Sequence, residues 1–328
     1  MPNRIRNIFN IINNVEERNS SIYVLFKSKN NNHPERWEVR KMRSSENLIR
    51  DLLELNRDFL SKFINNENLV VVDYQPGPSL GQNFVEQIPI NEVHEFEGIK
   101  NLVEECTLFF RDGLEIHNFR PYAYVIKFDV NFENQDEDSS IFVFQHIQKQ
   151  KAFRKGKILS KNHDKYDSLG EELYFLSDKF DCLYCDFNEY EEDDYNNMFI
   201  FNKQHFDWIF GFEEIFQNEI RERFQNDNGE FEDIINYENF AELVINNYQF
   251  IRKTYKLLQN GNFNTYFNRN VLERVPREAN ILELEWGQDG RLIVNETNVK
   301  KILNIVNEDY LKSIVSDTVF LSLSKTNI

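Results

Sequence analysis

Pairs of apolar runs joined by polar connections restrict the fold of this chain more than any other feature of its sequence. In the first pair, residues 21–26 (SIYVLF) and 37–42 (WEVRKM) flank the loop KSKNNNHPE. In the second, residues 122–130 (YAYVIKFDV) and 140–147 (SIFVFQHI) flank the acidic connection NFENQDEDS. Such runs of β-branched and aromatic residues predict antiparallel hairpins. Because hairpins outnumber strand–helix–strand units, we expect an α+β fold, with antiparallel hairpins and a mixed sheet packed against several amphipathic helices.

Further strands are predicted where apolar runs meet turn-forming residues. The run LVVVDY at residues 69–74 ends at Gln75-Pro76-Gly77-Pro78, and residues 79–91 are predicted to be a loop. The other expected strands lie at residues 181–187, 198–202, 281–286, 291–294 and 319–323, and 281–286 forms a hairpin with 291–294 through Gln288-Asp289-Gly290.

Helices are predicted where apolar residues recur three or four positions apart. The expected helices cover residues 1–15, 44–63, 99–106, 205–224, 240–258 and 299–311. Ser44 or Ser45 can cap the second of them. We expect the first to pack on the rest of the protein rather than to dock on a membrane surface.

The length of 328 residues allows one large domain or two medium ones. The character of the chain changes at Lys149, where a basic stretch begins. We therefore expect an N-terminal α+β domain at residues 1–148 and a C-terminal α+β domain at residues 149–328, with residues 149–165 as a basic linker.

The net charge of −17 predicts a surface that repels nucleic acid over most of its area and suits a partner with a basic face. Screening limits the reach of exposed charge to about 8 Å at physiological salt, so a local basic patch can act alone. Three cysteines are too few for a disulfide framework in a chain this long. Neither a signal peptide nor a membrane span is recognisable, so a cytoplasmic location is predicted, with any membrane contact peripheral or through a partner.

Motifs typical of enzymes are missing from the sequence. With 11 glycines, it contains neither a dinucleotide fingerprint nor a phosphate-binding loop, and no serine lies in a nucleophile-elbow motif. Cys182 and Cys185 form a CxxC motif inside a predicted strand, where residues three apart point to opposite faces, so we expect buried apolar side chains. The histidines lack metal-binding spacing, although His146 and His163 flank the basic stretch. The sequence therefore favours binding over catalysis, with no metal and no cofactor.

One enzymatic alternative remains open. Glu283 and Glu285 face the same side of a predicted strand, and with Asp181 they suggest a metal-dependent nuclease. We favour a solvated strand face for the two glutamates, because no lysine follows at the usual spacing.

The basic stretch is the strongest candidate for a binding site. Its cationic residues are Lys149, Lys151, Arg154, Lys155, Lys157, Lys161 and Lys165, with a single acid, Asp164, among them. Lysine and arginine in such density suit phosphate contacts, and Phe153 can stack on an exposed base. The alternative is a solvated linker whose charge offsets nearby acidic loops. Arg252, Lys253 and Lys256 form a second, weaker basic cluster on one helix.

The second half of the chain resembles the KwaB-like family of bacterial anti-phage defence proteins. The likeness lies in the segments SLGEELYFLSDKFDCLYCDF, MFIFNKQHFDWIFGFEEIF and VKKILNIVNEDYLKSIVSDTVFLSLSK. The residues that carry it are Phe180-Asp181, Ile200-Phe201-Asn202, the aromatic residues 206–212, Asp309-Tyr310-Leu311 and Ser324-Lys325. It covers residues 120–328 and implies no catalytic residue.

The resemblance implies a subunit of Kiwa, a two-component defence system. Such a subunit binds DNA without cutting it, hinders phage DNA replication or transcription, and associates with a membrane subunit of the KwaA type. The leading hypothesis is therefore a DNA-binding defence subunit that uses the basic stretch. The alternatives are the metal-dependent nuclease and a scaffold that docks its acidic surface on a membrane protein without binding DNA. A homodimer is compatible with each of them.

Overall fold

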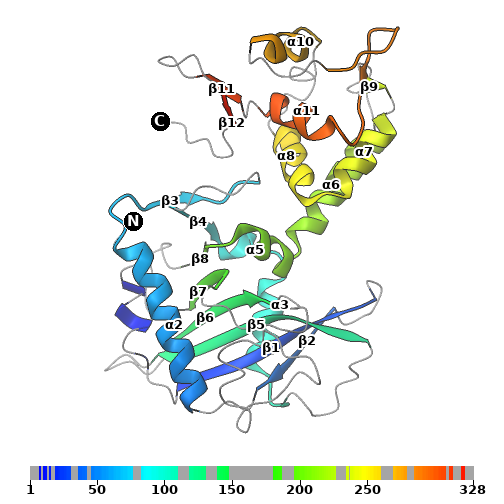
Figure 1. Ribbon diagram of the computed structural model, residues 1–328. Helices are drawn as coiled ribbons and strands as arrows, with labels where there is room; N and C mark the ends of the chain where they lie inside the picture. Colours follow the sequence, from blue (N-terminus) through cyan, green and yellow to red (C-terminus); the bar gives the residue numbers. More distant parts are fainter. Residues whose placement is uncertain are drawn as a thin grey trace, which may run out of the picture. The chain divides into compact units, whose positions relative to one another are not determined.

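The computed structural model divides the chain into two compact units. The first unit comprises Met1–Tyr74 and Asn83–Gly211, and the second comprises Gln75–Gln82 and Phe212–Ile328. The residues described by the structure are 7–8, 10–12, 15, 19–30, 36–42, 46–76, 83–109, 118–130, 139–147, 180–186, 196–226, 234–235, 237–259, 269–278, 284–307, 310–312 and 319–321. They form a mixed sheet, smaller pairs of strands and several helices, which confirms the α+β fold (Figure 1).

The first unit is built on an eight-stranded sheet with the order β2-β1-β5-β6-β7-β8-β4-β3. Its strands are β1 Ser20–Ser28, β2 Trp37–Lys41, β3 Val70–Asp73, β4 Phe84–Pro89, β5 Phe119–Val130, β6 Ser139–His146, β7 Cys182–Asp186 and β8 Asn197–Ile200. Neighbouring strands are antiparallel except for β3 and β4, which are parallel. The two N-terminal hairpins and the predicted strands β3, β7 and β8 are therefore confirmed.

The loop predicted at residues 79–91 is wrong for most of its length. Residues 84–89 form β4, which lies between β8 and β3, and a 3-10 helix follows at Ile90–Glu92. The strand was hidden because a charged residue occupies one of its buried positions. Glu86 is only 5% exposed, and its Oε1 accepts a hydrogen bond from Lys203 Nζ at 2.5 Å. Lys203 compensates the buried charge of Glu86, but it is too distant in the sequence for a local pattern to show this.

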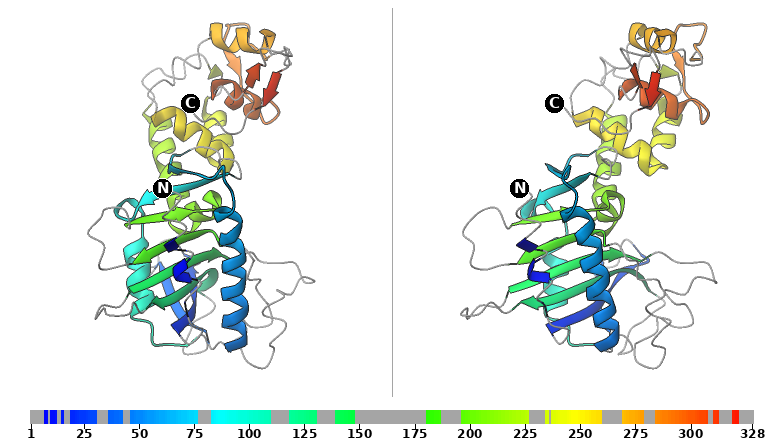
Figure 2. Two further views of the ribbon diagram at one scale, coloured as in Figure 1. Left: turned by 90° about the vertical axis from the view of Figure 1, so that its left-hand side faces the viewer. Right: turned by 60° about the vertical axis from the view of Figure 1, so that its left-hand side comes forward.

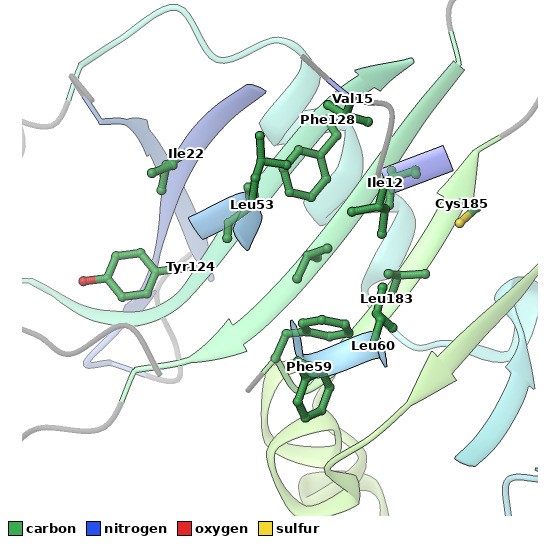
Figure 3. Packing of buried hydrophobic residues seen from close by; sticks show 14 of the residues in the cluster. Ile12, Val15, Ile22, Leu53, Phe59, Leu60, Tyr124, Phe128, Leu183 and Cys185 are labelled. Carbon is green, nitrogen blue, oxygen red and sulfur yellow. The ribbon is translucent and has the colours of Figure 1, made fainter. Parts of the chain in front are cut away.

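Helices cover both faces of the sheet. On one face, α2 (Glu46–Ile64) places Leu53, Phe59 and Leu60 in a buried cluster with residues of the central strands (Figures 2 and 3). Ile8 and Ile12 join this cluster, which confirms that the N-terminal helix packs on the protein. Helices α3 (Phe96–Glu104) and α5 (Lys203–Ile209) lie against the opposite face. The Phe96 ring of α3 contacts rings of β6 and β7, and Phe210, directly after α5, contacts Phe144 of β6.

The single helix predicted at residues 205–224 is wrong, because the chain breaks it at Gly211. Helix α5 ends at Ile209 and α6 spans Phe212–Gln225. Gly211 has a φ of 75°, a left-handed conformation that glycine adopts without steric cost. The two units also divide at this residue.

The helix predicted at residues 240–258 likewise consists of two, α7 (Tyr237–Ile245) and α8 (Tyr248–Gln259). Asn247 separates them, and its side-chain Oδ1 accepts hydrogen bonds from the backbone N–H groups of Gln249 (3.0 Å) and Phe250 (3.3 Å). An asparagine in this position caps a new helix. The helical spacing of apolar residues continues across the interruption and therefore did not reveal it.

The second unit packs α6, α7 and α8 together, with the rings of Phe216 and Tyr255 4.3 Å apart. It also contains α10 (Arg269–Glu278), α11 (Val299–Val306), the parallel pair β9 (Ile234–Ile235) and β10 (Leu292–Ile293), and the antiparallel pair β11 (Tyr310–Lys312) and β12 (Val319–Leu321). The predicted turn at residues 288–290 and the last strand are confirmed. The hairpin predicted around this turn is reduced to one bridge between Trp286 and Leu292, because β10 pairs with β9 instead and residues 284–285 are not strand. The last predicted helix is too long, because α11 ends at Val306 and residues 310–312 form a strand.

The predicted domain boundary at residues 149–165 lies outside the described residues and stays a prediction. The strands on either side of it, β6 and β7, are neighbours in the sheet of the first unit, where Ile141 pairs with Cys185.

Candidate functional site

All eight residues predicted to bind DNA, the seven cations and Phe153, lie between residues 148 and 179, outside the described part of the chain. The two ends of this stretch are described, however, and they meet. The His146 N–H donates to Asp181 Oδ2 at 2.6 Å, and the Asp181 N–H donates to Phe144 O at 2.9 Å. The described residues on either side of positions 148–179 therefore meet at one point of the first unit.

A group of rings surrounds this point, and we call it the aromatic–histidine cluster. It consists of Trp37, Tyr122, His146, His205 and Trp208. The His146 ring lies 5.0 Å from that of His205 and 5.1 Å from those of Trp208 and Tyr122, measured between centroids. His205 stacks on Trp208 at 5.4 Å with an interplanar angle of 28°. Strands β2, β5 and β6 and helix α5 thus contribute rings to one spot in the first unit.

A β-bulge brings Tyr122 into the cluster. In the pairing of β1 with β5, Leu25 faces Ala123 but Phe26 faces Pro121, so Tyr122 is the extra residue. A bulge of this kind redirects a side chain that regular alternation would send to the other face. The Tyr122 hydroxyl donates to Trp208 O at 3.2 Å, which ties β5 to α5.

Asp181 is the polar centre of the site. It is 3% exposed, and its Oδ1 accepts a hydrogen bond from His205 Nδ1 at 2.8 Å. Its carbonyl accepts from the N–H groups of Phe201 (2.8 Å) and Asn202 (3.0 Å). Burial raises the pKa of Asp181, although the hydrogen bond with His205 acts in the opposite direction. This one residue therefore joins the ends of β6, β7 and β8 to α5.

His146 is held in its neutral form. Burial, followed by the positive charges of His205, Arg120 and Lys27, lowers its pKa from 6.5 to about 4. Its buried Nδ1 has no hydrogen-bond partner among the residues that the structure describes. A proton there would add a charge beside existing cations, so the imidazole stays uncharged at neutral pH.

Two cations lie over the rings of the cluster. Lys27 Nζ is 4.9 Å from the centroid of Tyr122 and 5.4 Å from that of Trp37, and the Arg120 guanidinium is 5.5 Å from Tyr122. Glu95 fixes the Trp37 indole by accepting a hydrogen bond from its Nε1 at 2.7 Å. Arg120 is exposed, and Tyr122 is half-buried. Lys27 is only 8% exposed, so Arg120 beside the Tyr122 ring is the cation of this pair that can contact a phosphate next to a stacked base.

The weaker basic cluster on α8 does not form an exposed patch. Arg252 and Lys253 are 2% and 7% exposed, and Lys253 Nζ donates to Asn304 Oδ1. These side chains are buried inside the second unit, so the prediction of a second basic cluster is wrong for two of its three residues.

The carboxylates of the nuclease alternative serve separate contacts. Glu283 lies outside the described residues, and Glu285 Oε2 accepts a hydrogen bond from Asn295 Nδ2 at 3.3 Å. Asp181 bonds to His205. Within the described ranges, no group of three or more His, Cys, Asp or Glu residues is placed to hold a metal ion. Cys182 and Cys185 are buried and unbridged in β7, as predicted.

Sequence reasoning named His146 and Asp181 but did not predict that they lie together with Tyr122, His205 and Trp208. His146 was singled out because it precedes the basic stretch, and Asp181 carried the family resemblance as a structural residue. Tyr122, His205 and Trp208 gave no local signal, because sheet pairing and a bulge bring them together.

The fold and the cluster define a two-unit α+β protein in which the chain on either side of residues 148–179 meets beside aromatic rings. A family model described as Kiwa protein KwaB-like matches residues 121–316, well over half of the chain, and the chain belongs to this family. Membership makes it a subunit of the Kiwa anti-phage defence system, which implies partner subunits in a defence complex. No curated protein and no solved structure matches the chain significantly.

The matched residues include most of the aromatic–histidine cluster, since they begin one residue before Tyr122 and contain both histidines and Trp208. Among the described helices, none is long and apolar enough to cross a bilayer.

Proposed function

We propose that this chain binds DNA without cutting it, associates with a membrane subunit of the KwaA type, and thereby hinders phage DNA replication or transcription. The observation that supports DNA binding most directly is that the chain on either side of residues 148–179 meets at the hydrogen bond between His146 and Asp181. The exposed Arg120 lies over the Tyr122 ring beside this point, and the basic residues 149–165 belong to the connection that starts and ends there.

Chain connectivity concentrates positive charge at this point. Successive Cα atoms are about 3.8 Å apart, so the Cα of Lys149 lies within about 8 Å of that of Ile147. The Lys149 charge can therefore act together with that of Arg120, whose guanidinium lies over the Tyr122 ring to which Ile147 is bonded. Because exposed charge acts over about 8 Å at physiological salt, this local positive region can attract phosphates despite the net charge of −17.

The test is a titration of labelled DNA at several salt concentrations, read by fluorescence anisotropy. If all seven cations contact duplex phosphates, the slope of log affinity against log salt reaches about −6. The double variant Arg154→Glu/Lys155→Glu should reduce this slope by about 2 and weaken binding at all salts. The matched control is Lys300→Glu/Lys301→Glu on α11, which makes the same charge change in the second unit and should leave binding unchanged.

Normal binding by the Arg154/Lys155 variant would overturn the assignment of the basic stretch. Cleavage of the DNA with a divalent metal, lost in Glu285→Gln, would instead establish the nuclease. The Arg154/Lys155 and Lys300/Lys301 double variants change the net charge by the same amount. A general effect of added negative charge would therefore appear in the Lys300/Lys301 control as well.

Association with a membrane subunit is tested by co-expression and co-purification from detergent-solubilised membranes. Cytoplasmic loops of membrane proteins carry an excess of Lys and Arg, and a chain with a net charge of −17 complements them. We expect co-purification that weakens as salt rises. Co-purification by a chain with no DNA affinity at low salt would favour the scaffold. Light scattering on the purified chain decides whether it is a homodimer.

A further inference from the structure

We infer that the aromatic–histidine cluster binds an unpaired base, so that the preferred DNA is single-stranded or contains unpaired bases. The inference rests on the proposed function and names the form of DNA that this site takes. It comes from the described rings and cations, and not from the basic stretch itself.

The first step concerns the rings. Tyr122, His146, His205 and Trp208 are all half-buried, so each reaches solvent while the rest of it packs. Their centroids lie 5.0 to 5.4 Å apart along the path from Tyr122 through the two histidines to Trp208. Adjacent, partly exposed rings offer π-faces and edges on which any base can stack, whatever its identity.

The second step concerns rigidity. The Tyr122 hydroxyl is bonded to Trp208 O, and Asp181 holds the His205 ring. The Trp37 indole is fixed by Glu95, which is itself held by Arg36 at 2.6 Å and has a left-handed φ of 61°. Rings that are already ordered lose little conformational freedom when a base stacks on them, and this favours binding.

The third step concerns charge. The Arg120 guanidinium lies over Tyr122 and is exposed, so it can meet a phosphate next to a stacked base. Ile147, two residues before Lys149 in the sequence, is bonded at the same place, since its N–H donates to Tyr122 O at 2.8 Å. A single strand presents bases and phosphates together in this way, whereas a duplex stacks its bases on one another and offers mainly phosphates.

The experiment compares a labelled oligothymidine with a duplex, each of about 20 nucleotides per strand and so longer than a typical single-strand site. The variant Trp208→Leu removes one ring, and Trp286→Leu is the matched control in the second unit, where Arg269 covers the indole at 5.0 Å. We expect Trp208→Leu to weaken oligothymidine binding about 5- to 100-fold, the loss of one base–ring stack. Its duplex binding and all binding by Trp286→Leu should stay unchanged.

A second measurement uses the unaltered protein, in case Trp208→Leu does not fold. A 5-bromodeoxyuridine oligonucleotide is irradiated with the protein, and the crosslinked peptide is identified by mass spectrometry. Crosslinks at Tyr122 or Trp208 support the inference. Crosslinks confined to other peptides, or an equal loss of single-strand and duplex binding in Trp208→Leu, would overturn it while leaving DNA binding intact. An unaltered protein that binds neither DNA overturns the proposed function as well.

Discussion

Acid should destabilise the first unit through His146. Burial and nearby cations lower the pKa of this ring to about 4 in the folded protein, whereas the unfolded chain keeps a value near 6.5. The unfolded chain therefore takes up a proton first as the pH falls. The contribution of His146 to the stability of the folded protein is complete above pH 6.5 and is lost progressively between pH 6.5 and pH 4.

The size of this loss of stability follows from the shift in the pKa of His146. At about 1.4 kcal/mol for each pH unit, the contribution of His146 to the free energy of unfolding falls by at most about 3 kcal/mol across this range. We expect about 2 kcal/mol, because the ring keeps some contact with solvent. The variant His146→Phe removes the titrating group but keeps a ring, so the difference between its stability and that of the unaltered protein should shrink by this amount from pH 7 to pH 4.5.

The assay is urea unfolding followed by tryptophan emission. A Trp286→Phe background confines the signal to Trp37 and Trp208, which both belong to the first unit, and so avoids treating two units as one transition. The control is His94→Phe, since the His94 side chain is 50% exposed. The same dependence on pH in the unaltered protein and in His146→Phe would refute the reasoning, as would an equal change in His94→Phe.

Two further perturbations test the buried charges that hold the site. Asp181→Asn should lower the free energy of unfolding by about 1 to 3 kcal/mol, because an NH2 group replaces one of the two oxygens that accept from the His146 N–H and His205 Nδ1, and urea titration of the first unit measures this. Lys203→Met should cost about 3 to 5 kcal/mol, since it leaves Glu86 buried without its cation. The double variant Lys203→Met/Glu86→Met should recover most of that loss, and failure to recover would show that the cost comes from packing instead of charge.

Local patterns predicted most of the strands, because runs of β-branched and aromatic residues mark β1, β2, β5 and β6 in the sequence. They failed at β4, where the buried Glu86 is paired with Lys203 on a distant helix. They also failed at the helix interruptions. The spacing of apolar residues continues through Gly211 and Asn247. The helix nevertheless ends at each, because Gly211 adopts a left-handed conformation and Asn247 caps the next helix.

The candidate site was less predictable than the fold because its residues meet only through sheet order. His146 and Asp181 lie 35 positions apart, and His205 is a further 24 positions along the chain. The bulge that turns Tyr122 into the cluster depends on how β1 pairs with β5, which no pattern within β5 reveals. Charge counting was misleading on α8, where Arg252 and Lys253 are buried by the fold of the second unit.

The basic stretch belongs to a connection between two strands that is longer than the fold requires. Strands β6 and β7 are antiparallel neighbours, with Phe144 facing Cys182. A hairpin turn of about two to five residues is enough to join such strands. The chain instead inserts residues 147–181 between them, although the sheet pairing does not need this length. Connections that exceed about 15 residues in compact proteins are often functional. Asp181 closes this insertion beside the aromatic–histidine cluster, where the exposed Arg120 already lies over the half-buried Tyr122 ring. We propose that the positive charge of the insertion acts together with this cation and these rings.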